Sequence, residues 1–263
     1  MEFEFIEYSV QENTAVVKFN RPDVLNSFNR VMSKEVRTAL ESAGDDKNIR
    51  AIFITGNGKG FCAGQDLVEA VPPDGSTPPD LGDIVKENYN PIILLMRNID
   101  KPVVTAVNGV AAGAGANIAL AGDVIVASEK ASFIQAFTKI GVVPDSGGTY
   151  FLPRLVGMHR ASFLTMMADK LTADEAYNIG LVYKIFPLES FYDDALQAAH
   201  YLSQQPTKAL AMTKKMLNES YQNNLEQQLA LEAEMQSIAG KTYDYNEGVK
   251  AFQEKRKAEF KGE

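Results

Sequence analysis

Hydrophobic positions change their spacing along this chain, from short continuous runs in the first half to helical stripes in the second. Apolar runs at 6–10 and 14–19 flank a polar turn and predict a β-hairpin. Continuous apolar runs at 51–55, 103–107 and 124–127 predict strands that are buried on both faces, as in a parallel sheet covered by helices. We therefore expect an α/β fold.

Helical spacing dominates the remaining segments. Asn29 is a suitable N-cap for a helix whose apolar face carries Met32 and Val36, and a second helix is predicted over 85–97. The proline-rich segment 71–83 predicts a loop, either a lid beside a site or a plain surface excursion. Strand signals nearly vanish after about residue 157, where we expect amphipathic helices at 159–168, 173–179, 190–204, 207–220, 225–239 and 245–258. These patterns divide the chain into a core of residues 1–200 and a helical region of residues 201–263.

Composition narrows the possible functions. The net charge of −8 argues against nucleic acid or an anionic membrane surface as the main partner. The only cysteine, Cys62, excludes an internal disulfide and makes a cysteine-based metal site improbable. The two histidines, His159 and His200, are far apart in sequence, which excludes a histidine-rich metal centre. The acidic start MEFEFIEY does not resemble a signal peptide, so we expect a cytoplasmic protein.

The stretch 102–128 combines two apolar strands with a run of small residues between them. Gly113-Ala114-Gly115 stands where a helix begins, and the first N–H groups of a helix have no internal partners. The two glycines leave the backbone open to a ligand, which favours an anion site made of N–H groups. A membrane helix is disfavoured because Ala and Gly dominate, and a dinucleotide fingerprint because Ile118 takes its third glycine position. A helix that merely packs through small residues is an equally open alternative.

A second glycine-bearing turn, residues 56–66, follows the predicted strand 51–55. Gly64 permits an unusual backbone angle that would aim the Gln65 N–H into a cleft, whereas Asp66 is suited to cap the next helix. Both glycine-bearing turns follow the carboxyl end of a predicted parallel strand, where open α/β sheets bind ligands. Two such N–H groups would form an oxyanion hole for a carbonyl oxygen that becomes negative during reaction.

The proton carrier that such a site needs is offered by Asp145, in an otherwise apolar stretch before a predicted helix. The alternative role for Asp145 is that of a helix cap. Ser146 lies outside a GxSxG motif and has no histidine near it in sequence, which disfavours a serine nucleophile.

Together these segments resemble the crotonase, or enoyl-CoA hydratase/isomerase, family. The resemblance runs in order along nearly the whole chain, through Asn20-Arg21-Pro22 and segments 60–67, 101–109, 113–115 and 144–149. It implies a crotonase-like spiral of ββα units with a C-terminal helical trimerisation region. It also implies an acyl-CoA thioester as substrate, no separate cofactor, and the N–H groups of Gln65 and Ala114 as oxyanion-hole donors.

Two positions depart from the family's hydratases, which activate water with two glutamates. The corresponding residues are Asn117 and Phe137, and neither is a base. Asp145 instead resembles the carboxylate of the isomerase branch, which moves one proton between two carbons. The expected reaction is isomerisation of ring-1,2-epoxyphenylacetyl-CoA to an oxepin, a double-bond shift in a 3-enoyl-CoA, or both. Water addition to a 2-enoyl-CoA and non-catalytic acyl-CoA binding are the alternatives.

The resemblance further implies a substrate surface and an oligomer. Phe137 would stack on a ring-bearing acyl group, and Lys255 would reach the nucleotide of a neighbouring subunit or simply end a solvated helix. The predicted substrate-binding residues are Val24, Leu25, Ala63, Asp66, Leu67, Gly113, Asn117, Phe137 and Lys255. We expect a homotrimer or a dimer of trimers.

Overall fold

The computed structural model describes residues 2–71, 77 and 79–263, and its core is a six-stranded sheet with strand order β1-β2-β3-β5-β7-β10. The predicted hairpin pairs β1 with β2 in antiparallel register, and all other neighbours in this sheet are parallel. The apolar runs thus form the central parallel strands, as expected. The six strands are β1 (Ile6–Gln11), β2 (Thr14–Phe19), β3 (Ala51–Gly56), β5 (Val103–Val107), β7 (Val124–Ser128) and β10 (Lys184–Phe186).

A second, four-stranded sheet makes the fold a spiral. Its order is β4-β6-β8-β9, with the strands β4 (Gly60–Cys62), β6 (Val110–Ala112), β8 (Ser132–Ile134) and β9 (Leu171–Thr172). In the chain, β3, β5 and β7 of the large sheet are followed directly by β4, β6 and β8 of the small sheet. Each of these three turns of the spiral therefore contributes one strand to each sheet. Asn108 ties two of these corners together, since its Nδ2 donates to Gly58 O (3.0 Å) and Gly60 O (3.1 Å). The predicted spiral of ββα units is confirmed.

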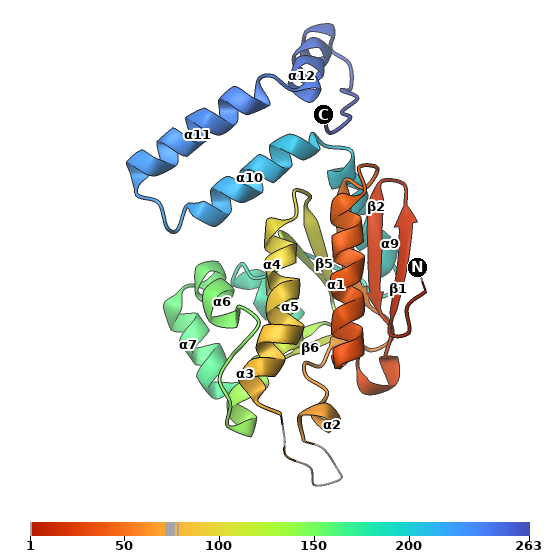
Figure 1. Cartoon of the computed structure of the whole chain (residues 1–263), viewed down its shortest axis with the longest axis vertical. Helices are drawn as coiled ribbons and strands as arrows, with labels where there is room; N and C mark the ends of the chain where they lie inside the picture. The colour runs from red at the N-terminus through yellow and green to blue at the C-terminus, as the bar shows by residue number, and fades with distance from the viewer. Residues whose placement is uncertain (1, 72–76, 78) are drawn as a thin grey trace.

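Helices cover both faces of the large sheet, which explains its continuous apolar strands (Figure 1). On one face lie α1 (Arg30–Asp45) and α4 (Asn90–Asn98), and on the other lies α9 (Phe191–Ser203). Asn29 caps α1 as predicted, because its side chain accepts the Met32 N–H at 2.8 Å. The expected helix over 85–97 begins instead with a π-helical turn, η2 (Val85–Tyr89), which continues into α4.

The remaining helices include those predicted after residue 157, with small shifts of their ends, and shorter ones for which no apolar stripe was predicted. They are η1 (Pro22–Val24), α2 (Leu67–Ala70), α3 (Leu81–Ile84), α5 (Ala114–Leu120), η3 (Ala136–Ile140), α6 (Gly148–Val156), α7 (Met158–Met167), α8 (Ala173–Asn178), α10 (Thr207–Glu219), α11 (Leu225–Ala239) and α12 (Tyr243–Glu254). The expectation that strands end near residue 157 is wrong for β9 and β10, which are too short to show a period. The predicted loop 71–83 ends in α3, and its residues 72–76 and 78 lie outside the described part.

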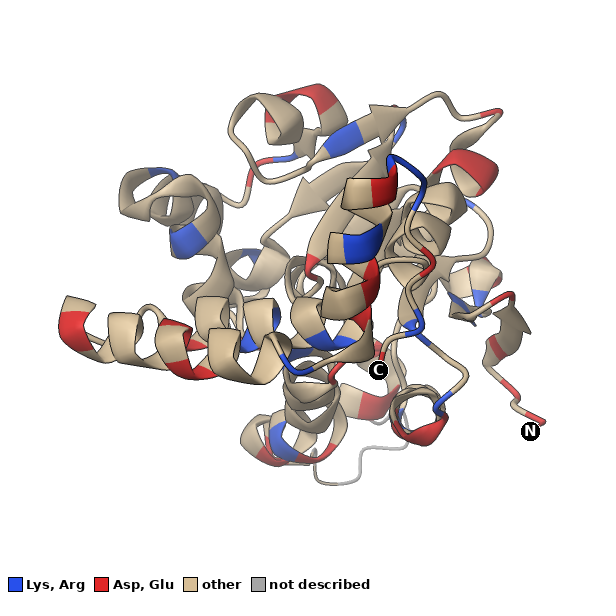
Figure 2. Cartoon of the chain, turned by 90° about the horizontal axis from the view of Figure 1, so that it is seen from above, with Lys and Arg blue, Asp and Glu red and all other residues tan. Residues whose placement is uncertain are grey.

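The last three helices, α10, α11 and α12, form a C-terminal arm that projects away from the sheets (Figure 1). An ionic joint fixes its base to the core, where Asp123 pairs with Arg97 of α4 at 2.8 Å and with Lys214 of α10 at 2.9 Å. Elsewhere acidic and basic side chains are interspersed along the helices (Figure 2). Among the described residues, no helix has the length and apolar character needed to cross a membrane.

Candidate active site

The two glycine-bearing turns meet in the structure. Gly64 follows β4 and has a φ of +97°, and a Cβ placed there would stand 3.0 Å from Ala112 O and 3.5 Å from Ala114 N. An L side chain at this position would therefore be strained and would crowd the start of α5. The spiral brings together two segments that lie about 50 residues apart in the sequence.

Backbone hydrogen bonds determine where the Gln65 N–H points. Phe28 N–H donates to Gly64 O at 2.7 Å, and Asp66 N–H donates to Phe28 O at 2.8 Å. In this parallel bridge the Gln65 N–H faces away from Phe28. Ala114 is the first residue of α5, so its N–H has no partner within the helix. Neither N–H donates to any residue that the structure describes, which leaves both available to a ligand.

Residues 20–28 brace the turn that carries Gln65. Arg21 Nη2 pairs with Asp66 Oδ2 at 2.9 Å, and Ala63 N–H donates to Leu25 O at 2.9 Å. These contacts bring together the predicted substrate-binding residues of segments 24–25 and 63–67. Three of them, Val24, Leu25 and Leu67, are exposed. The Asp66 carboxylate is committed to the protein, because its other oxygen caps α2 by accepting the Val68 N–H at 3.1 Å.

Asp145 lies on the turn before α6, where it is half-buried. Burial raises the pKa of Asp145 above its ordinary value, and the Ser146 hydroxyl, which donates to Oδ1 at 2.8 Å, opposes part of that rise. Ser146 has a φ of +50°, an uncommon backbone conformation for serine. A carboxyl group whose pKa is raised toward neutrality both takes and returns a proton more readily near neutral pH.

A buried amide network connects Asp145 to the helix that carries Ala114. Asn117 Nδ2 donates to Asp145 O at 2.8 Å, and Gln135 Nε2 donates to Asn117 Oδ1 at 2.8 Å. Asn117 has no exposed surface, so its side chain contacts only other residues of the protein and holds the Asp145 turn against α5. Sequence reasoning missed Gln135, which no motif distinguishes.

The remaining predicted residues lie in two different places. Phe137 is buried, and its Cζ lies 3.9 Å from the position that a Cβ on Gly113 would take. Its ring therefore borders the turn that presents the Ala114 N–H. Lys255 ends α12, at the opposite end of the molecule from α2 (Figure 1), and does not join the other candidates within one chain.

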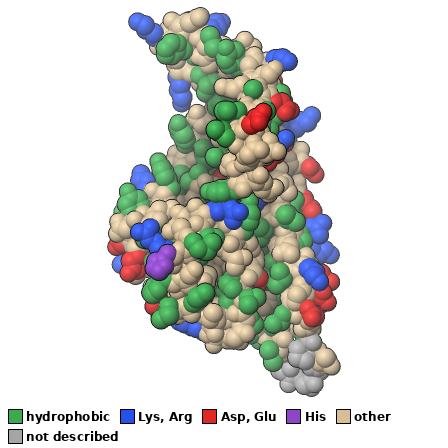
Figure 3. Space-filling model, turned by 90° about the vertical axis from the view of Figure 1, so that its left-hand side faces the viewer, with side chains coloured by type: hydrophobic (Ala, Val, Ile, Leu, Met, Phe, Trp, Pro, Cys, Tyr) green, Lys and Arg blue, Asp and Glu red, His purple; other side chains and the backbone are tan. Residues whose placement is uncertain are grey.

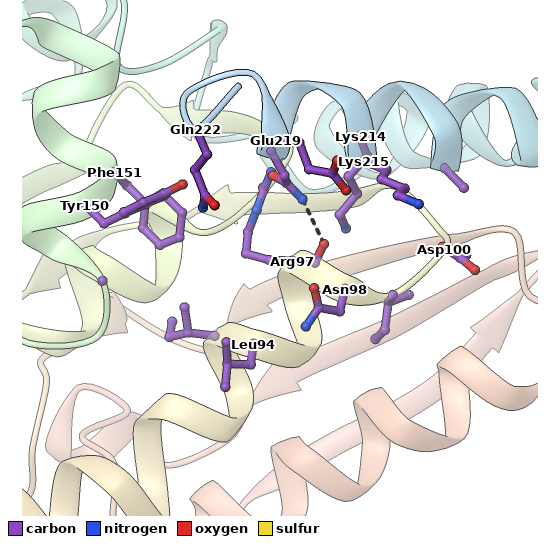
Figure 4. A pocket seen from close by; sticks show the side chains of 15 residues that line it. Leu94, Arg97, Asn98, Asp100, Tyr150, Phe151, Lys214, Lys215, Glu219 and Gln222 are labelled. Carbon is purple, nitrogen blue, oxygen red and sulfur yellow. Dashed lines mark hydrogen bonds between the residues drawn. The ribbon is translucent and has the colours of Figure 1, made fainter. Parts of the chain in front are cut away.

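A cavity of about 550 Å³ lies between α4, α6 and α10 and reaches Gly147, two residues after Asp145. Figure 4 shows the side chains that surround it, among them Leu94, Arg97, Tyr150, Phe151 and Lys214. Arg97 donates to the side chain of Asn218 across this space, so the cavity adjoins the ionic joint of the arm. Among the described residues, no cluster of His, Cys, Asp and Glu side chains is arranged to hold a metal ion.

Comparison with known proteins shows the family of this chain. Residues 9–263 match the family model described as Enoyl-CoA hydratase/isomerase. The chain is 43% identical to the 1,2-epoxyphenylacetyl-CoA isomerase of Escherichia coli strain K12, over 98% of this chain and 99% of that protein. It is 42% identical to a protein named probable enoyl-CoA hydratase from Rhodobacter capsulatus, over 100% of both chains. The crystal structure of enoyl-CoA hydratase from Bacillus anthracis superposes with a TM-score of 0.93 at 29% identity, covering 99% of this chain and 100% of that chain.

Proposed function

This chain belongs to the enoyl-CoA hydratase/isomerase family, and from that premise we propose that it is an acyl-CoA isomerase with Asp145 as its proton carrier. In this proposal the N–H groups of Gln65 and Ala114 hold the thioester oxygen. The coenzyme A portion of the substrate lies along the surface formed by segments 24–25 and 63–67. Coenzyme A is part of the substrate, and the proposed reaction needs no other cofactor.

The observation that carries the proposal is the link between Asp145 and α5. Asn117 holds the carbonyl of Asp145 at 2.8 Å and stands one helical turn after Ala114. This link supports a fixed spacing between the proton carrier and one oxyanion donor, which is the preorganisation that proton transfer beside an enolate requires.

The proposed reaction moves one proton and consumes no water. The Asp145 carboxylate removes a proton from a carbon of the acyl group, and the electron pair shifts toward the thioester oxygen. The two N–H groups stabilise the resulting negative charge, each by about 3–4 kcal/mol. Protonated Asp145 then returns the proton to another carbon, which restores the thioester and regenerates the carboxylate.

We propose ring-1,2-epoxyphenylacetyl-CoA as the substrate and 3-enoyl-CoA as a second substrate of the same site. With the first, the bond between the two epoxide carbons breaks as the electron pairs of the ring rearrange to the seven-membered oxepin, and the proton taken from the side-chain carbon next to the thioester is returned to a ring carbon. The first is supported by the name of the relative from Escherichia coli and by the Phe137 ring beside Gly113. An aromatic side chain at this place suits a ring-bearing acyl group. A 3-enoyl-CoA requires the same oxyanion hole and a single carboxylate.

Water addition is the second candidate, favoured by the hydratase name of the relative from Rhodobacter capsulatus. The side chains at the two glutamate positions argue against it. Asn117 uses its amide to hold Asp145 and Gln135, and Phe137 has no group that accepts a proton. Hydration here would need a group other than these to activate water.

We also propose that the C-terminal arm assembles the chain into a trimer or a dimer of trimers. Hydrophobic side chains are exposed along the arm and over α6 and α7 (Figure 3). Leu225, Leu229 and Phe252 of the arm are 75%, 55% and 85% exposed in the single chain. Such an assembly would bring Lys255 to the substrate of a neighbouring subunit. The proposed division of the chain into residues 1–200 and 201–263 places the arm in the second part.

Turnover of a small substrate panel tests the proposal. Purified protein is given crotonyl-CoA, a 3-enoyl-CoA, and ring-1,2-epoxyphenylacetyl-CoA made in situ by a coupled epoxidase, all in water enriched with ¹⁸O. We expect an isomer without ¹⁸O from the second or third substrate. Rapid formation of ¹⁸O-labelled 3-hydroxyacyl-CoA from crotonyl-CoA would instead establish a hydratase and contradict the mechanism.

A further inference from the structure

Tyr89 is a buried tyrosine whose hydroxyl serves the candidate site. It is the last residue of the π-helical turn η2 and is 1% exposed. Its O–H donates to Gln65 Oε1 at 2.7 Å, across 24 residues of sequence. Its ring stacks beside Phe28, with ring centroids 6.0 Å apart. Single π-helical turns inside α-helices are frequent at functional sites.

The bond from Tyr89 completes a three-point attachment of Gln65. Its backbone is held by the bridge to Phe28, its Oε1 accepts from Tyr89, and its Nε2 donates to Asp66 O at 3.1 Å. With both ends of the residue attached, rotation of the Gln65 peptide about the strand axis is restricted. The side chain of Tyr89, which belongs to none of the sequence motifs, therefore helps to restrict the direction of the Gln65 N–H.

The surroundings of Tyr89 keep its hydroxyl a donor. Burial raises the pKa of Tyr89 far above its usual value, and the negative charges of Asp145, Glu69 and Asp66 and the Cys62 thiol raise it further. The phenol is thus neutral over the whole working pH range, and it lies within electrostatic reach of the proton carrier. Its hydrogen bond to Gln65 persists while Asp145 gains and loses a proton.

We propose that Tyr89 is a positioning residue that, through Gln65 Oε1, aims the Gln65 N–H at the developing oxyanion. This proposal rests on the assignment of Gln65 as an oxyanion-hole donor. It predicts an effect on the transition state, in which the thioester oxygen carries full negative charge, and little effect on ground-state binding. Losing one donor outright lowers kcat by about 10²–10³-fold, so a donor that is present but misdirected should lower kcat by roughly 10–100-fold.

A double-mutant cycle tests the connection. Tyr89→Phe removes the donor and Gln65→Met removes the acceptor, with little change of shape in either case. Each single variant should lower kcat by roughly 10–100-fold with KM within about twofold of the wild type. Both changes break the bond between Tyr89 and Gln65, and Gln65→Met also removes the bond from Nε2 to Asp66 O, so the double variant should be no slower than Gln65→Met alone. Additive losses, or a raised KM with unchanged kcat, would overturn the proposal.

The matched control is Tyr192→Phe. The Tyr192 hydroxyl accepts from Gln11 Nε2 at 3.4 Å on the opposite side of the large sheet, so its loss should leave kcat and KM unchanged. An equal fall in kcat in this control would assign the effect of Tyr89→Phe to general loosening of the fold.

A spectroscopic measurement separates this proposal from the choice of reaction. Phenylacetyl-CoA labelled with ¹³C at the thioester carbonyl is bound to each protein, and its C=O stretch is recorded by infrared difference spectroscopy. Two aimed N–H donors should lower that frequency, and the shift should shrink in Tyr89→Phe and in Gln65→Met but not in Tyr192→Phe. An unchanged shift would refute the positioning role. A shift that shrinks as expected in a protein lacking isomerase activity would support Tyr89 and refute the proposed reaction alone.

Discussion

Replacing the Asp145 carboxylate by an amide should separate turnover from stability. In Asp145→Asn the Oδ1 atom still accepts from the Ser146 hydroxyl, and the backbone bonds to Asn117 and Gly148 are unaffected. Only the ability to take and return a proton is lost. A positioned acid–base group contributes about 10²–10⁴-fold to a rate, which corresponds to about 3–5 kcal/mol of transition-state stabilisation. We expect kcat to fall by that factor while the affinity for a CoA thioester persists.

The stability of the same variant should move in the opposite direction. Burial raises the pKa of Asp145 from its ordinary value of 3.8, so between the unfolded and folded pKa values the folded state binds more protons than the unfolded state. The contribution of this group to stability is therefore lost as pH rises through that window. The neutral amide avoids the loss. Asp145→Asn should have a Tm equal to or above that of the wild type at neutral pH, and the difference should vanish below about pH 3.8.

Initial rates are measured with whichever substrate of the panel the wild-type protein turns over. The Tm of each protein is measured by calorimetry at neutral and at acidic pH. Asp193→Asn, on the exposed start of α9, serves as the matched control and should change neither quantity. Full activity of Asp145→Asn would refute the assignment of the proton carrier. A large fall in its Tm at neutral pH would show instead that the carboxylate holds the fold together.

Three further predictions concern groups around the site. Ser146→Ala removes the hydrogen bond that opposes the raised pKa of Asp145, so the acid limb of the kcat/KM profile should move to higher pH; an unmoved limb would exclude Asp145 as the titrating group. Gly64→Ala should cost about 1–2 kcal/mol of stability and lower kcat by at least about 10²-fold, whereas Gly180→Ala, with a φ of +80° and nothing within 4 Å, should lower stability alone. Asp123→Ala leaves the Lys214 ammonium buried and unpaired, so urea unfolding should report a loss of about 3–5 kcal/mol; the same change at Asp83, in an exposed pair, should cost less than about 1 kcal/mol.

The large sheet could be predicted because each of its central strands is long and apolar enough to show a pattern. The second sheet could not, since β4, β6 and β8 have three residues each and lie among glycines and alanines. Only the pairing of these three strands with one another establishes the spiral. The same pairing brings the turns at Gly64 and Gly113 together, so the geometry of the site depends on the elements that were hardest to predict.

Within the candidate site, the residues that could be proposed from the sequence are those marked by their immediate neighbours in the chain. Neighbouring glycines made Gln65 and Ala114 candidates, the charge of Asp145 in an apolar stretch made it another, and the family resemblance supplied the role proposed for each. Tyr89 and Gln135 were not identified, because each acts through a partner 24 or 18 residues away. A buried tyrosine or glutamine looks the same in a sequence whether it fills the core or holds a catalytic segment in place.

The network behind Asp145 bears on the choice between isomerisation and hydration. Asn117 has no exposed surface, and a Cβ on Gly148 would lie 2.2 Å from its Nδ2, so the space around it is full. A glutamate there would have to bury one more methylene and a charge against the backbone of α6. The bond from Asn117 to the Asp145 carbonyl would be lost as well. In the proposed isomerase, the side chain that holds Asp145 in place therefore stands where the resemblance places one of the two water-activating glutamates of a hydratase, and these packing costs disfavour a glutamate there.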